Sequence, residues 1–231
     1  MFFMNNKGVE LEFIEGISKF NKNFLLLPKC NCNLYPYLGV IFIHIPKTGG
    51  TALSLSLAWE DFRLQISGHK PKWEMPNLTI HRHAKYKEFS EKLPKKIIDN
   101  SVIFCLVRNP WDTMLSSFMW FKQLAPTQVT NPKLQPLVNE VKHYSFEKFI
   151  NSDLGKKYIN WDLGEMWQYF QNTQGIDEVT FVSKLEDGDV LKRLGGLLKI
   201  EFKRNHKKYN FTQHNNYKEY YNGNSRDLVA N

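Results

Sequence analysis

The stretch of sequence with the most evident chemistry is PKTGGT, residues 46–51, in which a lysine precedes two glycines and hydroxyl side chains lie on either side of them. Glycine allows positive φ and a close approach of the backbone to a ligand. Successive N–H groups in such a loop converge on an oxyanion, and a helix that begins there adds its partial positive charge. We therefore predict an anion-binding loop to which the lysine adds a mobile full charge. Its residues are Lys47, Thr48, Gly49, Gly50, Thr51 and Ala52.

The order of residues in this loop differs from that of a kinase phosphate loop. A Walker A loop has its lysine after the glycines, whereas Lys47 comes before them. The next apolar run, residues 101–107, ends in Arg108 and not in the aspartate that would hold magnesium. An ATP-dependent kinase with a P-loop-like domain therefore stays an alternative that both observations weaken.

A second strand-to-helix turn surrounds Arg108, which follows the apolar run 101–107. Asn109 is a residue type that caps helices, Pro110 suits a first helical turn, and Asp112 is favourable near the positive helix end. This turn is predicted to present the arginine, whose planar guanidinium can bind a phosphate through two hydrogen bonds. A local ion pair between Arg108 and Asp112 is the alternative use of the side chain.

Two histidines lie between these turns, in TIHRHAKYKEF, residues 79–89. If residues 80–83 are extended, His81 and His83 project to one side and Arg82 to the other. A neutral imidazole titrates near physiological pH and therefore suits a general base for an attacking hydroxyl. A solvated basic stretch without chemistry is the alternative interpretation. Carboxylates that could serve as the base instead are Glu60, Asp61 and Glu88.

Together the two turns resemble the nucleotide-binding motifs of the sulfotransferases that use 3′-phosphoadenosine 5′-phosphosulfate (PAPS). The order P-K-T-G-G-T after a strand is similar to the family's loop for the 5′-phosphosulfate. FCLVRNPWDTMLSSF, residues 104–118, resembles V-R-N-P-x-D-R-x-x-S-x-Y, whose arginine and serine hold the 3′-phosphate. Arg108 and Ser116 match these two positions. Thr113 and Phe118 depart from the arginine and the tyrosine that are frequent there.

The histidine segment extends the resemblance to enzymes that act on carbohydrates. His81-Arg82-His83 resembles the H-x-H segment of the uronyl and heparan sulfate 2-O-sulfotransferases, and His83-Ala84 resembles the H-A segment of the broader carbohydrate sulfotransferases. The resemblance implies a histidine base, for which His83 is the first choice and His81 the second. It also implies that Lys47 stabilises the leaving nucleotide, 3′,5′-bisphosphoadenosine (PAP), and that no metal takes part.

The activity that the resemblance implies is transfer of a sulfuryl group from PAPS to a hydroxyl, most naturally one of a carbohydrate or glycoconjugate. The net charge of +8 suits an anionic glycan as the acceptor. The same charge would suit a non-catalytic protein that binds polyanions, but that function leaves both turns without a purpose. For this reason we do not expect nucleic acid as a partner.

Alternating strands and helices must position these residues. Apolar runs that predict buried strands lie at residues 40–45, 101–107 and 178–182. Helical patterns lie at residues 52–59, 86–93, 111–124, 137–151, 162–171 and 190–198, the last broken at Gly195-Gly196. The alternation predicts an α/β protein, a single P-loop-like domain with a central, mainly parallel sheet flanked by helices. That domain would span residues 1–231, with an N-terminal extension at 1–38 and a core at 39–231.

Composition excludes several other classes of protein. Hydrophobic residues make up 42% of the chain and aromatic residues 14%, which is too many for a disordered chain. The three cysteines form no disulfide framework; Cys30 and Cys32 lack a partner pair at zinc-site spacing, and Cys105 is expected in the core. The start of the chain does not read as a signal peptide, and no run approaches the roughly 18 apolar residues of a membrane span. We therefore expect a cytoplasmic protein.

Overall fold

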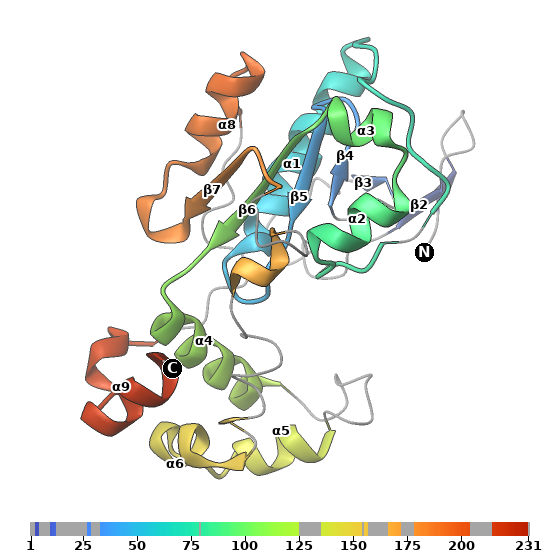
Figure 1. Ribbon diagram of the computed structural model, residues 1–231. Helices are drawn as coiled ribbons and strands as arrows, with labels where there is room; N and C mark the ends of the chain where they lie inside the picture. Colours follow the sequence, from blue (N-terminus) through green and yellow to red (C-terminus); the bar gives the residue numbers. More distant parts are fainter. Residues whose placement is uncertain are drawn as a thin grey trace.

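The computed structural model contains both strands and helices (Figure 1). It describes residues 3–4, 10–12, 27–28, 33–78, 80–124, 135–153, 155–156, 166–171, 178–203 and 214–230. The strands are β1 (Phe3–Met4), β2 (Glu10–Glu12), β3 (Leu27–Pro28), β4 (Leu34–Tyr35), β5 (Val40–Ile43), β6 (Val102–Val107) and β7 (Phe181–Lys184). The α-helices are α1 (Gly50–Ile66), α2 (Tyr86–Lys92), α3 (Lys95–Asp99), α4 (Pro110–Gln123), α5 (Gln135–Val141), α6 (Phe146–Asn151), α8 (Val190–Leu198) and α9 (Gly223–Ala230). Short 3-10 helices are η3 (Met166–Tyr169), η4 (Leu185–Asp187) and η5 (Tyr217–Glu219).

The main sheet has four strands in the order β4-β5-β6-β7, while β1, β2 and β3 form a second, antiparallel sheet. In the main sheet β4 runs antiparallel to β5, and β5, β6 and β7 are parallel. Phe42, Phe104 and Phe181 lie opposite one another on these three strands, and their rings stack with centroids 5.1 and 5.0 Å apart. The predicted α/β class with a mainly parallel sheet is confirmed.

Helices cover both faces of the main sheet (Figure 1). Ile41 and Ile43 of β5 pack with residues of α2 and α3, whereas Val40 and Phe42 pack on the other face with residues of α1 and α8. Side chains alternate across a strand, so β5 supplies core residues to both layers. All four of its residues are buried, which explains why its sequence is apolar throughout and does not alternate with polar residues.

Helix α4 connects the sheet to a separate group of helices. It starts directly after β6 and leads away from the sheet toward α5, α6 and α9 (Figure 1). Leu115 and Phe118 of α4 pack there with Phe146 and Phe149 of α6, and partly buried tyrosines of the C-terminal segment cover the same cluster. The first turn of α4, which follows Arg108, is therefore held between two cores.

The predicted elements recur with shifted ends and three differences. Of the helix predicted at 162–171, residues 166–169 form the 3-10 helix η3, and residues 162–165 lie outside the described part of the chain. The helical stretch at 137–151 is divided, because the Ser145 side chain accepts a hydrogen bond from Lys148 N–H and caps a new helix, α6. The predicted break at Gly195-Gly196 is wrong, since α8 runs through both glycines. A Cβ on Gly195 would lie 2.7 Å from the carbonyl oxygen of Ile200, so this glycine allows close packing at the end of the helix.

Some predictions lie outside the described residues, among them those for Cys30 and Cys32 and for most of the loop at 125–136. Cys105 is fully buried in β6, as expected of a small core residue. None of the helices in the described part of the chain has the length and apolar character needed to cross a membrane.

Candidate functional site

The two predicted phosphate turns lie side by side. They follow β5 and β6, which are adjacent and parallel, with Ile43 paired to Cys105, so both turns emerge at the same edge of the sheet. The Nη1 atom of Arg108 donates a hydrogen bond of 3.1 Å to the carbonyl oxygen of Lys47. The structure therefore brings together the two cations that the sequence predicts separately, at the carboxyl ends of neighbouring strands where ligands of α/β proteins bind.

Backbone conformation in the first turn depends on its glycines. Gly49 has φ of 81° and is the N-cap of α1, and Lys47 also has positive φ, 62°. A Cβ on Gly50 would lie 2.2 Å from Cδ2 of His44, so the imidazole ring takes the space of any side chain there. Thr48 is fully buried, and its hydroxyl donates to the carbonyl oxygen of Ile45. This threonine therefore holds the loop together from inside.

Lys47 has an environment that weakens its hold on a proton. Burial, and to a smaller extent the charge of Arg108, lower its pKa to about 8. Its ammonium group lies 5.1 Å from the centre of the ring of Trp120, a residue of α4. A partly desolvated cation attracts an anion more strongly than one in bulk water, because the local dielectric constant is lower.

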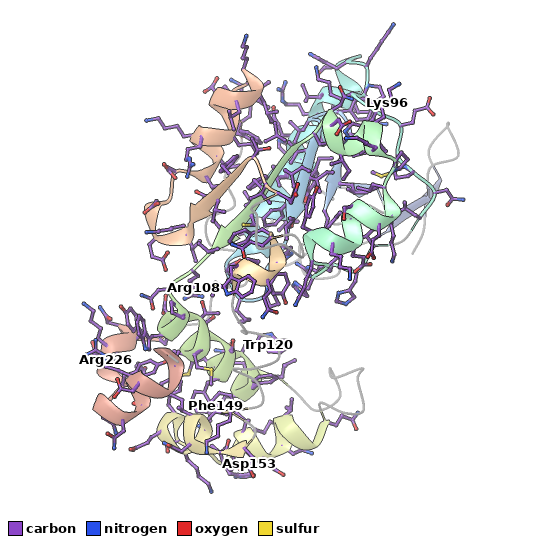
Figure 2. The ribbon with its side chains drawn as sticks, viewed as in Figure 1. Lys96, Arg108, Trp120, Phe149, Asp153 and Arg226 are labelled. Atoms are coloured by element: carbon purple, nitrogen blue, oxygen red, sulfur yellow. The ribbon has the colours of Figure 1, made fainter. Side chains whose placement is uncertain are left out.

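Arg108 is held between the two turns by its own contacts. Its Nε and Nη2 atoms both lie within hydrogen-bonding distance of Asp112 Oδ2, at 2.9 and 2.8 Å, and its side chain is only 12% exposed. The local ion pair considered above is thus present, together with the contact to Lys47. Arg108 marks the junction between the sheet and α4 in Figure 2, where Trp120 is labelled further along the helix.

The predicted cap of α4 is confirmed. The Asn109 side chain accepts hydrogen bonds from the N–H groups of Trp111 and Asp112, and Pro110 takes the first helical position. The C-terminal segment packs against this turn, because Tyr221 donates its hydroxyl proton to the carbonyl oxygen of Trp111 at 2.8 Å. Sequence reasoning did not find this support, which joins residues 110 positions apart.

Residues further along α4 point into the protein. Ser116 is only 3% exposed, so it belongs to the packed side of the helix. Thr113, which stands where the related motif has an arginine, is fully buried and donates its hydroxyl to the carbonyl oxygen of Asn109. A long charged side chain at position 113 would have no room in this packing, which gives a structural reason for the departure.

His83 is the predicted base whose geometry is best defined. Its Nδ1 atom lies 2.8 Å from the carbonyl oxygen of His44, and since a carbonyl only accepts, Nδ1 carries the proton. Its Nε2 atom makes no hydrogen bond to any described residue and is left with a free lone pair. Burial lowers the pKa of His83, an effect that the hydrogen bond to His44 partly offsets. The imidazole is therefore neutral at neutral pH and can accept a proton at Nε2.

His81 and Arg82 differ from the extended arrangement considered above. Residues 81–84 form a turn, closed by a hydrogen bond from Ala84 N–H to the carbonyl oxygen of His81. His81 is exposed and accepts a hydrogen bond from the N–H of His83 through Nδ1. Arg82 points toward the first loop and donates from Nη2 to the Thr51 hydroxyl at 2.7 Å. The turn thus places a third cation next to the loop.

His44 is a site residue that sequence reasoning missed. It is 2% exposed, its ring touches Gly50, and it accepts a hydrogen bond at Nδ1 from Arg82 Nε at 3.3 Å. Burial, followed by the charges of His83 and Arg82, lowers its pKa well below the usual value, so it stays neutral. The available signal was a single histidine in the otherwise apolar run VIFIHI, immediately before the loop.

Two of the three alternative carboxylates lie far from the loop. Glu60 and Asp61 are in the third turn of α1, about 15 Å from its first residue at 1.5 Å per residue. Glu60 is paired with Arg63, and Asp61 accepts a hydrogen bond from Leu38 N–H. Glu88 alone lies near the histidines, with its carboxylate 3.4 Å from His81 N.

The arrangement can bind a strongly anionic group and accept a proton beside it. Lys47 lies in a glycine loop at the start of a helix, with Arg82 and Arg108 in contact with that loop. Beside it is a neutral histidine, His83, whose Nε2 atom bonds to none of the described residues. Among the described residues no cluster of three or more His, Cys, Asp or Glu could hold a metal ion. Comparison with known proteins adds no relative: no family model, no curated protein and no solved structure matches the chain.

Proposed function

We propose that this protein is a PAPS-dependent sulfotransferase with a P-loop-like domain, acting on a hydroxyl of a carbohydrate. The single observation that supports this most is the 3.1 Å hydrogen bond from Arg108 to the carbonyl of Lys47. It joins two phosphate-type turns that lie 61 residues apart in the chain. A protein that binds both the 3′- and the 5′-phosphate of one nucleotide needs two such turns, and they must be no further apart than the nucleotide is long.

Each turn binds one end of the donor. The backbone N–H groups of the loop and the positive end of α1 hold the 5′-phosphosulfate, with Lys47 beside it; these residues are Lys47, Thr48, Gly49, Gly50, Thr51 and Ala52. Arg108 holds the 3′-phosphate, and Ser116, which lies on the packed side of α4 in this structure, would have to become exposed to join it. Asp112 already orients the guanidinium of Arg108. The arginine side chain therefore loses little conformational entropy when it binds the phosphate.

The reaction is a displacement at sulfur. A bond forms between the acceptor oxygen and sulfur, while the bond between sulfur and the bridging oxygen of the 5′-phosphate breaks. The acceptor proton passes to Nε2 of His83, whose Nδ1–H stays bonded to the carbonyl of His44. The electron pair of the broken bond stays on the bridging oxygen of PAP, where Lys47 stabilises the growing negative charge. His81 is the second candidate for the base, since it lies beside His83 with ring centroids 5.9 Å apart.

The charge around the base suits an acidic acceptor. Arg82 and Lys85 are both exposed on the segment that carries His83. Cations placed along the approach to a base raise the local concentration of anionic substrates. A glycan that bears uronate or sulfate groups is therefore the acceptor class that we propose.

Calorimetric titration with PAP, AMP and ATP tests the donor before any acceptor is known. We expect saturable binding of PAP, at least about tenfold tighter than that of AMP, because only PAP carries the 3′-phosphate that Arg108 would bind. Magnesium should leave PAP binding unchanged. Equal affinities for PAP and AMP would contradict the assignment of Arg108, and magnesium-dependent hydrolysis of ATP would favour the kinase.

A transfer assay then tests the reaction. Labelled sulfate from PAPS should appear in a uronate-containing glycan, with one PAP released for each sulfate transferred. A salt titration separates this enzyme from a non-catalytic polyanion binder, whose glycan affinity falls steeply with ionic strength while PAP has no special effect.

A further inference from the structure

Arg82 forms contacts that none of the proposed roles uses. Its Nη2 atom donates to Thr51 Oγ1 at 2.7 Å, and its Nε atom donates to His44 Nδ1 at 3.3 Å. The main chain at Arg82 is also fixed, because Asn33, a buried residue next to β4, donates from Nδ2 to the carbonyl oxygen of Arg82 at 3.0 Å. The guanidinium is therefore held at the rim of the anion loop, although the residue as a whole is exposed.

Arg82 and His83 are oriented by the same buried residue. The ring of His44 accepts the hydrogen bond from Arg82, while its carbonyl oxygen accepts the one from Nδ1 of His83. His44 cannot shift easily, because its ring lies against Gly50 and stacks on Phe42 with centroids 5.4 Å apart. One rigid group thus sets the distance between the extra cation and the base.

Most of the hydrogen-bonding capacity of Arg82 remains available. A guanidinium has five N–H groups. Arg82 donates two of them, to Thr51 and His44, and the other three make no hydrogen bond to any residue that the structure describes. They lie on Nη1 and Nη2, the pair of nitrogens that binds an oxyanion end-on.

We propose that Arg82 binds the sulfonate group of the donor and so distinguishes PAPS from its product PAP. This inference rests on the proposed function. If the 5′-phosphate lies in the loop that includes Thr51, and the acceptor hydroxyl lies at His83, then the sulfonate is between them by connectivity. Arg82 touches the loop and belongs to the histidine turn, so its free N–H groups are at this intermediate place.

Binding there would aid transfer as well as recognition. During displacement the charge of the sulfonate is spread over three non-bridging oxygens, by analogy with phosphoryl transfer. Two N–H groups of Arg82 bind two of these oxygens and keep the sulfur in line with the acceptor oxygen.

The competing explanation is that Arg82 only joins the histidine turn to α1. A structural link would affect PAP and PAPS equally, because both need the loop in place. A sulfonate contact would affect PAPS alone. The ratio of the two affinities therefore separates the explanations without any acceptor or turnover.

The experiment measures dissociation constants of PAP and PAPS by calorimetry, without acceptor, for the wild-type protein and for Arg82→Gln and Arg82→Lys. We expect Arg82→Gln to raise the PAPS dissociation constant about tenfold or more and to change that of PAP by less than about twofold. Arg82→Lys keeps the charge but not the fork, so it should give a smaller loss for PAPS only. Lys85→Gln is the matched control, since it removes an exposed cation of the same segment that contacts Gln168 and not the loop.

The outcomes separate this inference from the function on which it rests. If the wild type binds neither nucleotide, the sulfotransferase proposal fails and this inference with it. If the wild type binds both but Arg82→Gln weakens them equally or not at all, only the role of Arg82 is wrong. A loss with Lys85→Gln as large as that with Arg82→Gln would show general electrostatics and also overturn the specific contact. Should Arg82→Gln not fold, a PAPS-selective loss in Arg82→Lys supports the proposal and an equal loss contradicts it.

Discussion

The Nδ1 atom of His83 lies 2.8 Å from the carbonyl oxygen of His44, and this contact determines which nitrogen of His83 can act as a base. A carbonyl cannot donate, so the proton of the neutral ring is on Nδ1 and the lone pair is on Nε2. An exposed histidine would exchange between the two tautomers. The loop that precedes the anion site thus also prepares the base beside it.

Replacing His83 by alanine should greatly lower the rate of turnover and leave the affinity for the donor nucleotide unchanged. We expect kcat to fall by about 10²- to 10⁴-fold, the usual contribution of a general base, with the PAP dissociation constant within about twofold of wild type. Transfer of labelled sulfate and calorimetry measure the two quantities. His81→Ala is the matched control, and a loss of turnover in that variant alone would exchange the two roles.

Activity should depend on pH in two directions. His83 must be neutral to accept a proton, so kcat/KM should fall as the pH drops through its lowered pKa. Lys47 must be charged, so kcat/KM should fall as the pH rises through its pKa of about 8. Lys47→Arg keeps its charge above pH 8 and should remove the alkaline decrease from whatever activity it retains, whereas Lys47→Ala should be inactive. An unchanged alkaline decrease in Lys47→Arg would assign it to another group.

Arg108 should discriminate between nucleotides by their 3′-phosphate. Arg108→Ala should raise the PAP dissociation constant by about 10- to 100-fold, since a hydrogen bond to a charged group contributes about 1.5–3 kcal/mol. Binding of AMP should stay within about twofold. Arg108→Lys should fall between wild type and Arg108→Ala because a lysine has the charge without the fork. Equal losses for AMP and PAP would mean that Arg108 supports the loop through Lys47 and does not read the phosphate.

Gly50 should be required for stability as well as for binding. A Cβ at this position would lie 2.2 Å from Cδ2 of His44, and such overpacking typically costs about 1–3 kcal/mol of unfolding free energy. Denaturant unfolding should show that loss in Gly50→Ala. Gly196→Ala is the control in α8, where a Cβ meets nothing within 4 Å and a modest stabilisation is expected. A Gly50→Ala variant as stable as wild type would show that His44 can move aside.

Local parts of this site could be predicted from the sequence because local chemistry determines them. The cap of α4 needs only Asn109 and the residues that follow it, and the glycine turn before α1 needs only the conformational freedom of its own residues. The buried strands could be recognised because a parallel strand that packs on both faces is apolar throughout. The division between α5 and α6 was missed because a single serine cap outweighed the helical pattern around it.

Residues close together in the sequence thus determined which segments form the buried strands, which form the helices after them, and which turns carry cations. Only the tertiary structure decided that β5 and β6 are neighbours, that Arg108 reaches Lys47, and that Arg82 points toward Thr51. Pairing of distant strands and packing around a buried His44 depend on contacts between residues far apart in the chain. No periodicity or spacing within a segment encodes such contacts, because their free energy arises only when the whole core is formed.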